Sequence, residues 1–312
     1  MSSEANDATS YLKHTKDGGE WMEIDTKGKR PAKRRAHSGV VAGKKELVIF
    51  GGKSGETKQP LKDLWTLNLN DWTWREHVNV RFPGPPRKGH SAVIVGDEMF
   101  VFGGRSSNTD YYGELIALQF DTQNWSPSAW REIKLPPEAK RPASRNHHVA
   151  SALAGKRMLI YGGRGGHDPS VPLMSDVWIF DANTETWTSV VPFPDPSKPR
   201  FIGLPRPRIE SANAALSEEA MVMAGGRDWQ GKTLNDAWVL EIPKDKNTAT
   251  WRSISPVDCS VEQVSDTVTY VSFGFFVGLC AVLGMFLLYR YRSRVRRAPY
   301  EPITSEKATT SV

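Results

Sequence analysis

The seven residues Glu46–Gly52, ELVIFGG, recur with small changes three times further along the chain. The later copies are EMFVFGG at residues 98–104, RMLIYGG at 157–163 and AMVMAGG at 220–226. Each run is apolar, rich in β-branched or other strand-forming residues, and closed by glycine, which is typical of a β-strand. A spacing of about fifty residues is the period of a four-stranded repeat unit. The sequence therefore predicts an all-β protein built from four complete repeats.

Three further landmarks keep their place in every repeat. Thirteen or 14 residues before the first glycine lies a histidine or serine, and three residues before that lies an arginine; a tryptophan follows the second glycine by 22 to 26 residues. The arginines are Arg34, Arg87, Arg145 and Arg208, the next set is His37, His90, His148 and Ser211, and the tryptophans are Trp74, Trp130, Trp187 and Trp251. The strand before each tryptophan begins with an acid in DLWTLNL, ELIALQF, DVWIFDA and DAWVLEI, from Asp63, Glu114, Asp176 and Asp236.

This order of Arg-x-x-His, apolar strand, Gly-Gly, acid-led strand and tryptophan strand resembles the kelch repeat. The resemblance covers about residues 6–254 and implies a kelch-type β-propeller within residues 1–256, with repeats at about 34–79, 87–135, 145–191 and 208–255. The fourth repeat departs from the pattern, because Ser211 replaces the histidine and Ala224 precedes the glycines. We expect its innermost strand to pack less well than the others.

The glycines and tryptophans have a structural explanation. Paired glycines suit a tight turn beside a neighbouring backbone, where a Cβ would clash or a positive φ is required. Tryptophan supplies a large apolar wedge between adjacent sheets. We therefore expect both sets to serve the packing of the propeller.

The first residues predict only part of a blade. NDATSYLKHTKDGGEWMEI, from Asn6, aligns with LNDAWVLEIPKDKNTATWRSI, from Leu234, so residues 6–25 correspond to a third and fourth strand. A propeller protects its strand edges by closing into a ring. Four and a half blades are compatible with a truncated chain, completion by another chain or a small irregular ring, and the sequence favours truncation.

One segment near the end has the composition of a membrane span. Residues 267–289, TVTYVSFGFFVGLCAVLGMFLLY, carry no charge and are long enough to cross a bilayer as a single helix. Five arginines follow within residues 290–297, so the positive-inside bias places the tail, residues 290–312, in the cytoplasm. Residues 257–266 are the expected juxtamembrane linker. A buried globular helix is the alternative.

The tail carries two short interaction motifs. Tyr300-Glu-Pro-Ile303 resembles the Tyr-x-x-apolar sorting signal that clathrin adaptors bind, with Tyr300 and Ile303 as its key residues. The end Thr310-Ser311-Val312 resembles a PDZ ligand, in which Val312 fills an apolar pocket and Thr310 forms a hydrogen bond. A PDZ scaffold and a clathrin adaptor are therefore expected partners.

The side of the membrane on which the propeller lies stays open. The N-terminus, MSSEANDATSYLKH, has no apolar run and is not a signal peptide. A truncated chain would place the propeller outside the cell or in a lumen, which is the favoured expectation, whereas a complete chain would be tail-anchored with a cytosolic propeller. Cys259 and Cys280 alone cannot form a disulfide framework that would decide this.

Strand direction brings two sets of basic residues to one face. The first strand of a meander starts, and the second ends, at the same edge of the sheet. Eight cations occupy these positions: Arg34, Arg87, Arg145, Arg208, Lys53, Arg105, Arg164 and Arg227. Outside the tail, 35 Lys and Arg stand against 33 Asp and Glu, so such a cluster is unusual in a nearly neutral body. We expect this mouth to bind an acidic protein segment or an anionic glycan. The alternative, strongest for the first four, is that the arginines brace blades by binding carbonyls.

Enzymatic alternatives find little support in the residues. A galactose-oxidase-like copper centre would need a thioether cysteine among paired tyrosines and histidines, and the propeller repeats contain no cysteine. His167 and Asp168 lack a second ligand pair and are more typical of a turn. We therefore expect a non-enzymatic binding protein that needs no cofactor or metal. The expected membrane anchor argues against nucleic acid as a partner, although KGKRPAKRR, residues 27–35, has six positive residues in nine.

Overall fold

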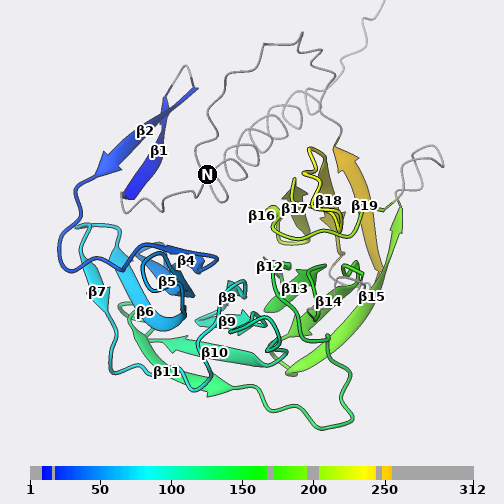
Figure 1. Cartoon of the computed structure of the whole chain (residues 1–312), viewed down its shortest axis with the longest axis horizontal. Helices are drawn as coiled ribbons and strands as arrows, with labels where there is room; N and C mark the ends of the chain where they lie inside the picture. The colour runs from blue at the N-terminus through cyan, green and yellow to red at the C-terminus, as the bar shows by residue number, and fades with distance from the viewer. Residues whose placement is uncertain (1–8, 16–17, 167–171, 195–203, 244–247, 255–312) are drawn as a thin grey trace, which may run out of the picture.

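The computed structural model of the chain describes residues 9–15, 18–166, 172–194, 204–243 and 248–254. Every named element within these ranges is a β-strand. Figure 1 shows the sheets arranged side by side as an arc around a central axis. The expected all-β propeller architecture is confirmed.

Four blades contain four strands each, and consecutive strands within a blade pair antiparallel. The first comprises β4 (Ser38–Ala42), β5 (Glu46–Ser54), β6 (Pro60–Asn68) and β7 (Trp74–Glu76), with the short β3 (Arg34–Arg35) beside β5. The second comprises β8 (Ser91–Val95), β9 (Glu98–Phe102), β10 (Leu115–Phe120) and β11 (Pro127–Glu132). The third comprises β12 (Val149–Leu153), β13 (Arg157–Tyr161), β14 (Val177–Asp181) and β15 (Thr186–Pro194). The fourth comprises β16 (Ala212–Ser217), β17 (Ala220–Ala224), β18 (Ala237–Glu241) and β19 (Thr248–Ile254).

The first strand of each blade lies nearest the axis. β4 contacts β8, β8 contacts β12, and β12 contacts β16 (Figure 1). In β8 and β12 buried residues alternate with half-buried ones, whereas β16 is half-buried or exposed along its whole length. β16 is therefore the least buried innermost strand, as expected; like β4, which also has exposed residues, it contacts the innermost strand of only one neighbouring blade in the described part of the chain.

Most of the repeat tryptophans pack between neighbouring blades, as expected. Three of the four contact the aromatic residue that precedes the Gly-Gly pair of the preceding blade, whereas Trp74 packs against Ile49, Trp65 and Leu67 of its own blade. The ring centroids are 5.1 Å apart for Trp130 and Phe50, 5.3 Å for Trp187 and Phe102, and 4.9 Å for Trp251 and Tyr161. The corresponding residue of the fourth blade is Ala224, which has no aromatic ring for such a contact.

The glycine pairs have the predicted geometry. Gly104 has a φ of +91°, and a Cβ there would lie 2.9 Å from the Cβ of His90 and 3.1 Å from the carbonyl oxygen of Lys88. Gly52, Gly163 and Gly226 have φ values between +96° and +97° and similarly close neighbours. Both a positive φ and a close backbone therefore require glycine here.

Two features lie outside the regular blades. The end of β15 pairs in parallel with β19, from Val191 opposite Thr248 to Pro194 opposite Trp251, so the third and fourth blades form one eight-stranded sheet. Near the N-terminus, β1 (Thr9–Thr15) and β2 (Gly18–Ile24) form a separate antiparallel pair. This pair lies beside the first blade in Figure 1.

The expected membrane helix and tail are not among the described residues. Residues 257–266, 267–289 and 290–312 all lie outside them, and so do Tyr300, Ile303, Thr310 and Val312. The described part of the chain contains no helix that could span a membrane.

Candidate functional site

The four arginines of the Arg-x-x-His motifs are buried, with side chains 0–5% exposed. Arg145 donates two hydrogen bonds of 2.7 Å to the carboxylate of Asp176 and one of 3.0 Å to the carbonyl of Gly162. The other three repeat the arrangement: Arg34 with Asp63 and Gly51, Arg87 with Glu114 and Gly103, and Arg208 with Asp236 and Gly225. Each guanidinium thus ties the start of its blade to the second and third strands.

The aspartates in these pairs are held in their charged form. Burial alone would raise the pKa of Asp176, but hydrogen bonds from Arg145 and from the indole of Trp178 outweigh it, and the pKa lies below its usual value. Asp63 and Asp236 have the same balance, with Trp65 and Trp238 as the indole donors. The Asp-x-Trp sequence that opens three of the third strands therefore serves this brace.

The same arginines also connect neighbouring blades through their backbone. The amide of Gly52 donates to the carbonyl of Arg87 at 2.9 Å, Gly104 to Arg145 at 2.8 Å, and Gly163 to Arg208 at 3.3 Å. This geometry matches the brace alternative. The buried side chains of Arg34, Arg87, Arg145 and Arg208 do not fit the expected role in partner binding, because a partner could not reach them without opening the blade.

The cations that follow the Gly-Gly pairs are more exposed than the motif arginines. Each sits directly after its Gly-Gly pair, opposite the residue that follows the motif arginine: Lys53 opposite Arg35, Arg105 opposite Lys88, Arg164 opposite Asn146, and Arg227 opposite Ile209. Lys53, Arg105 and Arg164 are partly exposed and Arg227 is exposed. The structure thus places all four at equivalent positions of the mouth, and two further cations, Arg35 and Lys88, lie beside them.

A chain of backbone hydrogen bonds connects these positions from blade to blade. The residue two places after each motif arginine has a positive φ: 53° at Ala36, 66° at Gly89, 54° at His147 and 60° at Glu210. Gly89 donates to Ala36 at 2.8 Å, His147 to Gly89 at 2.7 Å, and Glu210 to His147 at 3.2 Å. We call these four residues the inner collar. It fixes the spacing of the cations that surround it.

Two neighbouring groups respond to five of these cations, and Arg164 pairs with Asn146, the residue directly before His147. The pKa of Lys88 is lowered, first by partial burial and then by the charges of Arg105, Lys53 and Arg35. The pKa of His147 is lowered by burial and by Arg105, Arg227 and Lys88, against the opposing effect of Glu210. We call Arg35, Lys53, Lys88, Arg105, Arg164 and Arg227 the basic cluster.

Acidic groups compensate this cluster only in part. Glu210 forms an ion pair with Arg227 and lies 3.9 Å from Nε2 of His147. Arg105 donates to the side chain of Asn108 at 3.1 Å, and its guanidinium lies 5.6 Å from the ring centre of Tyr111. Glu210 is the only carboxylate for which a salt bridge to the basic cluster is found among the described residues.

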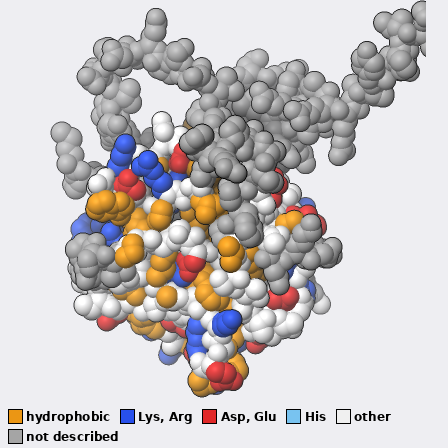
Figure 2. Space-filling model, turned by 90° about the vertical axis from the view of Figure 1, so that its right-hand side faces the viewer, with side chains coloured by type: hydrophobic (Ala, Val, Ile, Leu, Met, Phe, Trp, Pro, Cys, Tyr) orange, Lys and Arg blue, Asp and Glu red, His pale blue; other side chains and the backbone are white. Residues whose placement is uncertain are grey.

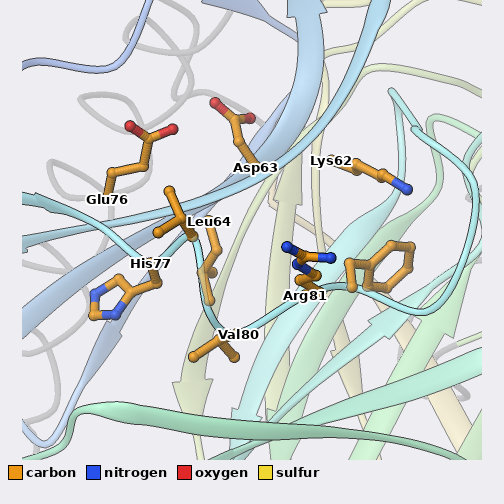
Figure 3. A pocket seen from close by; sticks show the side chains of 9 residues that line it. Lys62, Asp63, Leu64, Glu76, His77, Val80 and Arg81 are labelled. Atoms are coloured by element: carbon orange, nitrogen blue, oxygen red, sulfur yellow. The ribbon is translucent and has the colours of Figure 1, made fainter.

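A separate cavity of about 470 Å³ lies on the first blade, between β6, β7 and the following loop (Figure 3). Leu64, Val80 and Phe82 form its apolar wall. Its carboxylates already have cationic partners, because Asp63 binds Arg34 and Glu76 binds Lys29 at 2.8 Å. It shares no residue with the basic cluster.

Charge elsewhere on the molecule is mixed. Figure 2 views the side of the molecule that lies to the right in Figure 1, and shows Lys and Arg side chains interspersed with Asp and Glu around apolar patches. In the described ranges no group of three or more His, Cys, Asp or Glu is arranged to hold a metal ion, and His167 and Asp168 lie outside them.

The residues that sequence reasoning missed are Arg35, Lys88, His147 and Glu210. They occupy the two positions inside the Arg-x-x-His motif, between landmarks that were assigned to packing. Because the chain turns through a positive φ there, these side chains reach the same mouth as the residues after Gly-Gly. Their position one or two residues after the motif arginine is the sequence signal that could have identified them.

Four-stranded sheets arranged around an axis and a repeated arginine brace define a β-propeller. The chain belongs to the kelch-repeat family: residues 2–203 and 85–277 match the KLHDC2/KLHL20/DRC7 Kelch-repeats domain. This membership indicates a protein-interaction module.

Relatives with kelch-type similarity come from several organisms. The chain is 30% identical over 184 residues to host cell factor homolog hcf-1 of Caenorhabditis elegans, covering 52% of this chain and 23% of that protein. It is 30% identical over 179 residues to human Kelch domain-containing protein 3, covering 55% and 44%, and 29% identical over 231 residues to the Drosophila melanogaster homolog of leucine-zipper-like transcriptional regulator 1, covering 72% and 21%. The chain thus spans less than half the length of these relatives.

Proposed function

We propose that this chain is a non-enzymatic binding protein whose mouth captures an acidic segment of a protein partner through the basic cluster. The observation that supports this most directly is the proximity of five cations from three blades, with Arg164 at the equivalent position of the remaining blade and with one ion-paired carboxylate, Glu210, among the described residues. Like charges held together cost free energy, which an anionic partner offsets while gaining long-range attraction. The buried motif arginines hold the strands of each blade together and so fix the positions from which the basic cluster extends.

A double charge reversal tests the proposal. Arg105→Glu with Arg164→Glu should lower the affinity of the chain for a fluorescent polyglutamate peptide by about tenfold or more at low salt, and should flatten the dependence on salt. The matched control is Lys44→Glu with Lys45→Glu, which changes the same charge in the exposed turn between β4 and β5.

Equal loss in both double variants would mean that only net charge matters, and would contradict the proposal. Retained affinity with an unchanged salt slope in the Arg105 and Arg164 variant would also contradict it. A sulfated oligosaccharide is titrated in parallel. If it depended on Arg105 and Arg164 while the peptide bound neither form of the chain, an anionic glycan would replace the protein segment as the occupant.

We further propose that residues 267–289 anchor the chain in a membrane with the tail cytoplasmic, and that Tyr300 with Ile303 and Thr310 with Val312 couple the captured partner to a clathrin adaptor and a PDZ scaffold. The uncharged span followed by five arginines supports this. In sealed vesicles with the propeller outside, protease should digest the propeller and spare a tag at Val312. Digestion of both from the same side would establish the tail-anchored alternative with a cytosolic propeller.

A further inference from the structure

The loop between β17 and β18 carries a single tryptophan, Trp229, two residues after Arg227 of the basic cluster. It begins at Arg227, directly after the glycine pair, and closes where Arg227 pairs with Thr233. Leu234 donates to Gly226 at 2.9 Å, Asp228 to Lys232 at 3.1 Å, and Gly231 to Asp228 at 3.0 Å, all through the backbone. These bonds fix both ends of the loop.

The side chain of Asp228 holds the interior of the same loop. It is 6% exposed, and its Oδ1 accepts from the amides of Gln230 at 3.0 Å and Lys232 at 2.9 Å. Trp229, between Asp228 and Gln230, is 67% exposed, the largest fraction among the large hydrophobic residues of the described ranges. The chain therefore holds an indole in water on a loop that is already ordered.

The neighbouring side chains are cationic. Arg227 is 49% exposed and belongs to the basic cluster, and Lys232 is exposed. The loop of the second blade has the same plan, because Arg105 pairs with Tyr111 across it and stacks on that ring. Arg105 pairs with Lys88 and Arg227 pairs with Ile209, and these partners directly precede Gly89 and Glu210, so both loops start beside the inner collar.

We infer that Trp229 is the apolar anchor of the mouth, and that the partner is an extended acidic peptide carrying an aromatic or large aliphatic side chain among its carboxylates. This inference rests on the proposed function. Tryptophan and arginine are the residues that most often carry binding energy at interfaces, and an anchor that is ordered beforehand loses little conformational entropy. Carboxylates bind the basic cluster in a salt-dependent way, and the apolar side chain adds a contribution that salt does not screen.

Two fluorescent peptides separate these contributions: polyglutamate with a central phenylalanine, and the same peptide with a central alanine. The chain should bind the phenylalanine peptide about five- to tenfold more tightly. Trp229→Ala should abolish this ratio and leave the salt slope unchanged, whereas Trp229→Phe should keep most of it. Val191→Ala removes part of another exposed apolar side chain, on β15, and should change neither quantity.

The possible failures differ from one another. If Trp229→Ala retained the ratio, or if the unaltered chain showed none, Trp229 would not be the anchor, while the salt slope could still support the basic cluster. If the ratio depended on Trp229 but the Arg105 and Arg164 reversal changed nothing, the charge proposal would fail and the apolar anchor would remain. If Trp229→Ala weakened only a sulfated oligosaccharide, the peptide would be the wrong class of ligand.

Discussion

At the scale of single residues, the motif arginine decides whether the repeat is a packing device or a binding device. Arg145 is fully buried and forms three hydrogen bonds with Asp176 and Gly162, while its carbonyl binds Gly104 of the preceding blade. Removing one member of a buried ion pair leaves the other uncompensated. Asp176 is partly exposed, so water moderates that cost.

We predict that Arg145→Ala lowers the free energy of unfolding by about 2–4 kcal/mol. Urea unfolding followed by tryptophan fluorescence measures it. Lys140→Ala, at an exposed residue of the loop before the third blade, should change the stability by less than about 0.5 kcal/mol. A chain that kept its stability after Arg145→Ala but lost peptide binding would show instead that this arginine faces a partner.

Buried histidines make the stability depend on pH. Burial, followed by the charge of Arg34, lowers the pKa of His37 to about 4. The pKa values of His90 and His148 are also lowered well below their usual value, first by burial and then by Arg87 and Arg145 respectively. These side chains stay neutral in the folded chain but take up protons near pH 6.5 when it unfolds, so acid favours the unfolded state.

We therefore predict that the free energy of unfolding falls between pH 7.5 and pH 5, with about 2 kcal/mol of the loss coming from His37. Asp63, Asp176 and Asp236 have lowered pKa values, so their contribution is complete above pH 3.8 and is lost only at lower pH. Urea midpoints at several pH values distinguish the two ranges. Constant stability down to pH 5 would contradict the assignment to histidine.

At the scale of the strand and turn, the second glycine of each Gly-Gly pair is required both by its positive φ and by its close neighbours. Comparing it with a glycine that has only the positive φ separates the two requirements. Gly104 and Gly231 both have a positive φ, at 91° and 80°. A Cβ at Gly104 would meet His90 and Lys88, whereas a Cβ at Gly231 has nothing within 4 Å. The first position therefore has a steric cost in addition to the backbone cost.

Gly231→Ala should lower the stability by about 1 kcal/mol, the cost of a left-handed alanine. Gly104→Ala should lower the stability by clearly more than this, because the new Cβ would also push against His90 and Lys88. Thermal unfolding midpoints of the two variants give the comparison. Equal losses would show that the neighbours of Gly104 yield without strain, and that φ alone selects glycine.

At the scale of the whole molecule, the sequence predicted the blades well because their spacing is set by local rules. Gly-Gly ends a strand, the acid-led strand follows, and Trp130, Trp187 and Trp251 meet aromatic residues one blade earlier. The role of the arginines could not be read in the same way. Strand direction places Arg145 and Arg164 at one edge of the sheet. Only the three-dimensional structure shows that Arg145 is buried against Asp176, whereas Arg164 is partly exposed.

The candidate site was predictable only in part for the same reason. The positions after Gly-Gly were expected at the mouth, but the inner collar depends on positive φ values at Ala36, His147 and Glu210, which are not glycines and give no local signal. Trp229 was also missed, because a lone tryptophan in a loop follows no repeat. Its significance comes from its exposure and from the hydrogen bonds that order its loop.

The parallel pairing of β15 with β19 gives the arc unequal seams. Between the first and second blades, and between the second and third, no strands pair: packed side chains, a few backbone hydrogen bonds, the side-chain contacts of His90 with Ser38 and of His148 with Ser91, and the ion pair of Arg131 with Glu185 make the join. Between the third and fourth blades, four residue pairs of a continuous sheet are added far from the axis. Under a pulling force, we therefore expect the blades to separate first between the first and second or between the second and third, and we expect the third and fourth blades to stay attached to each other.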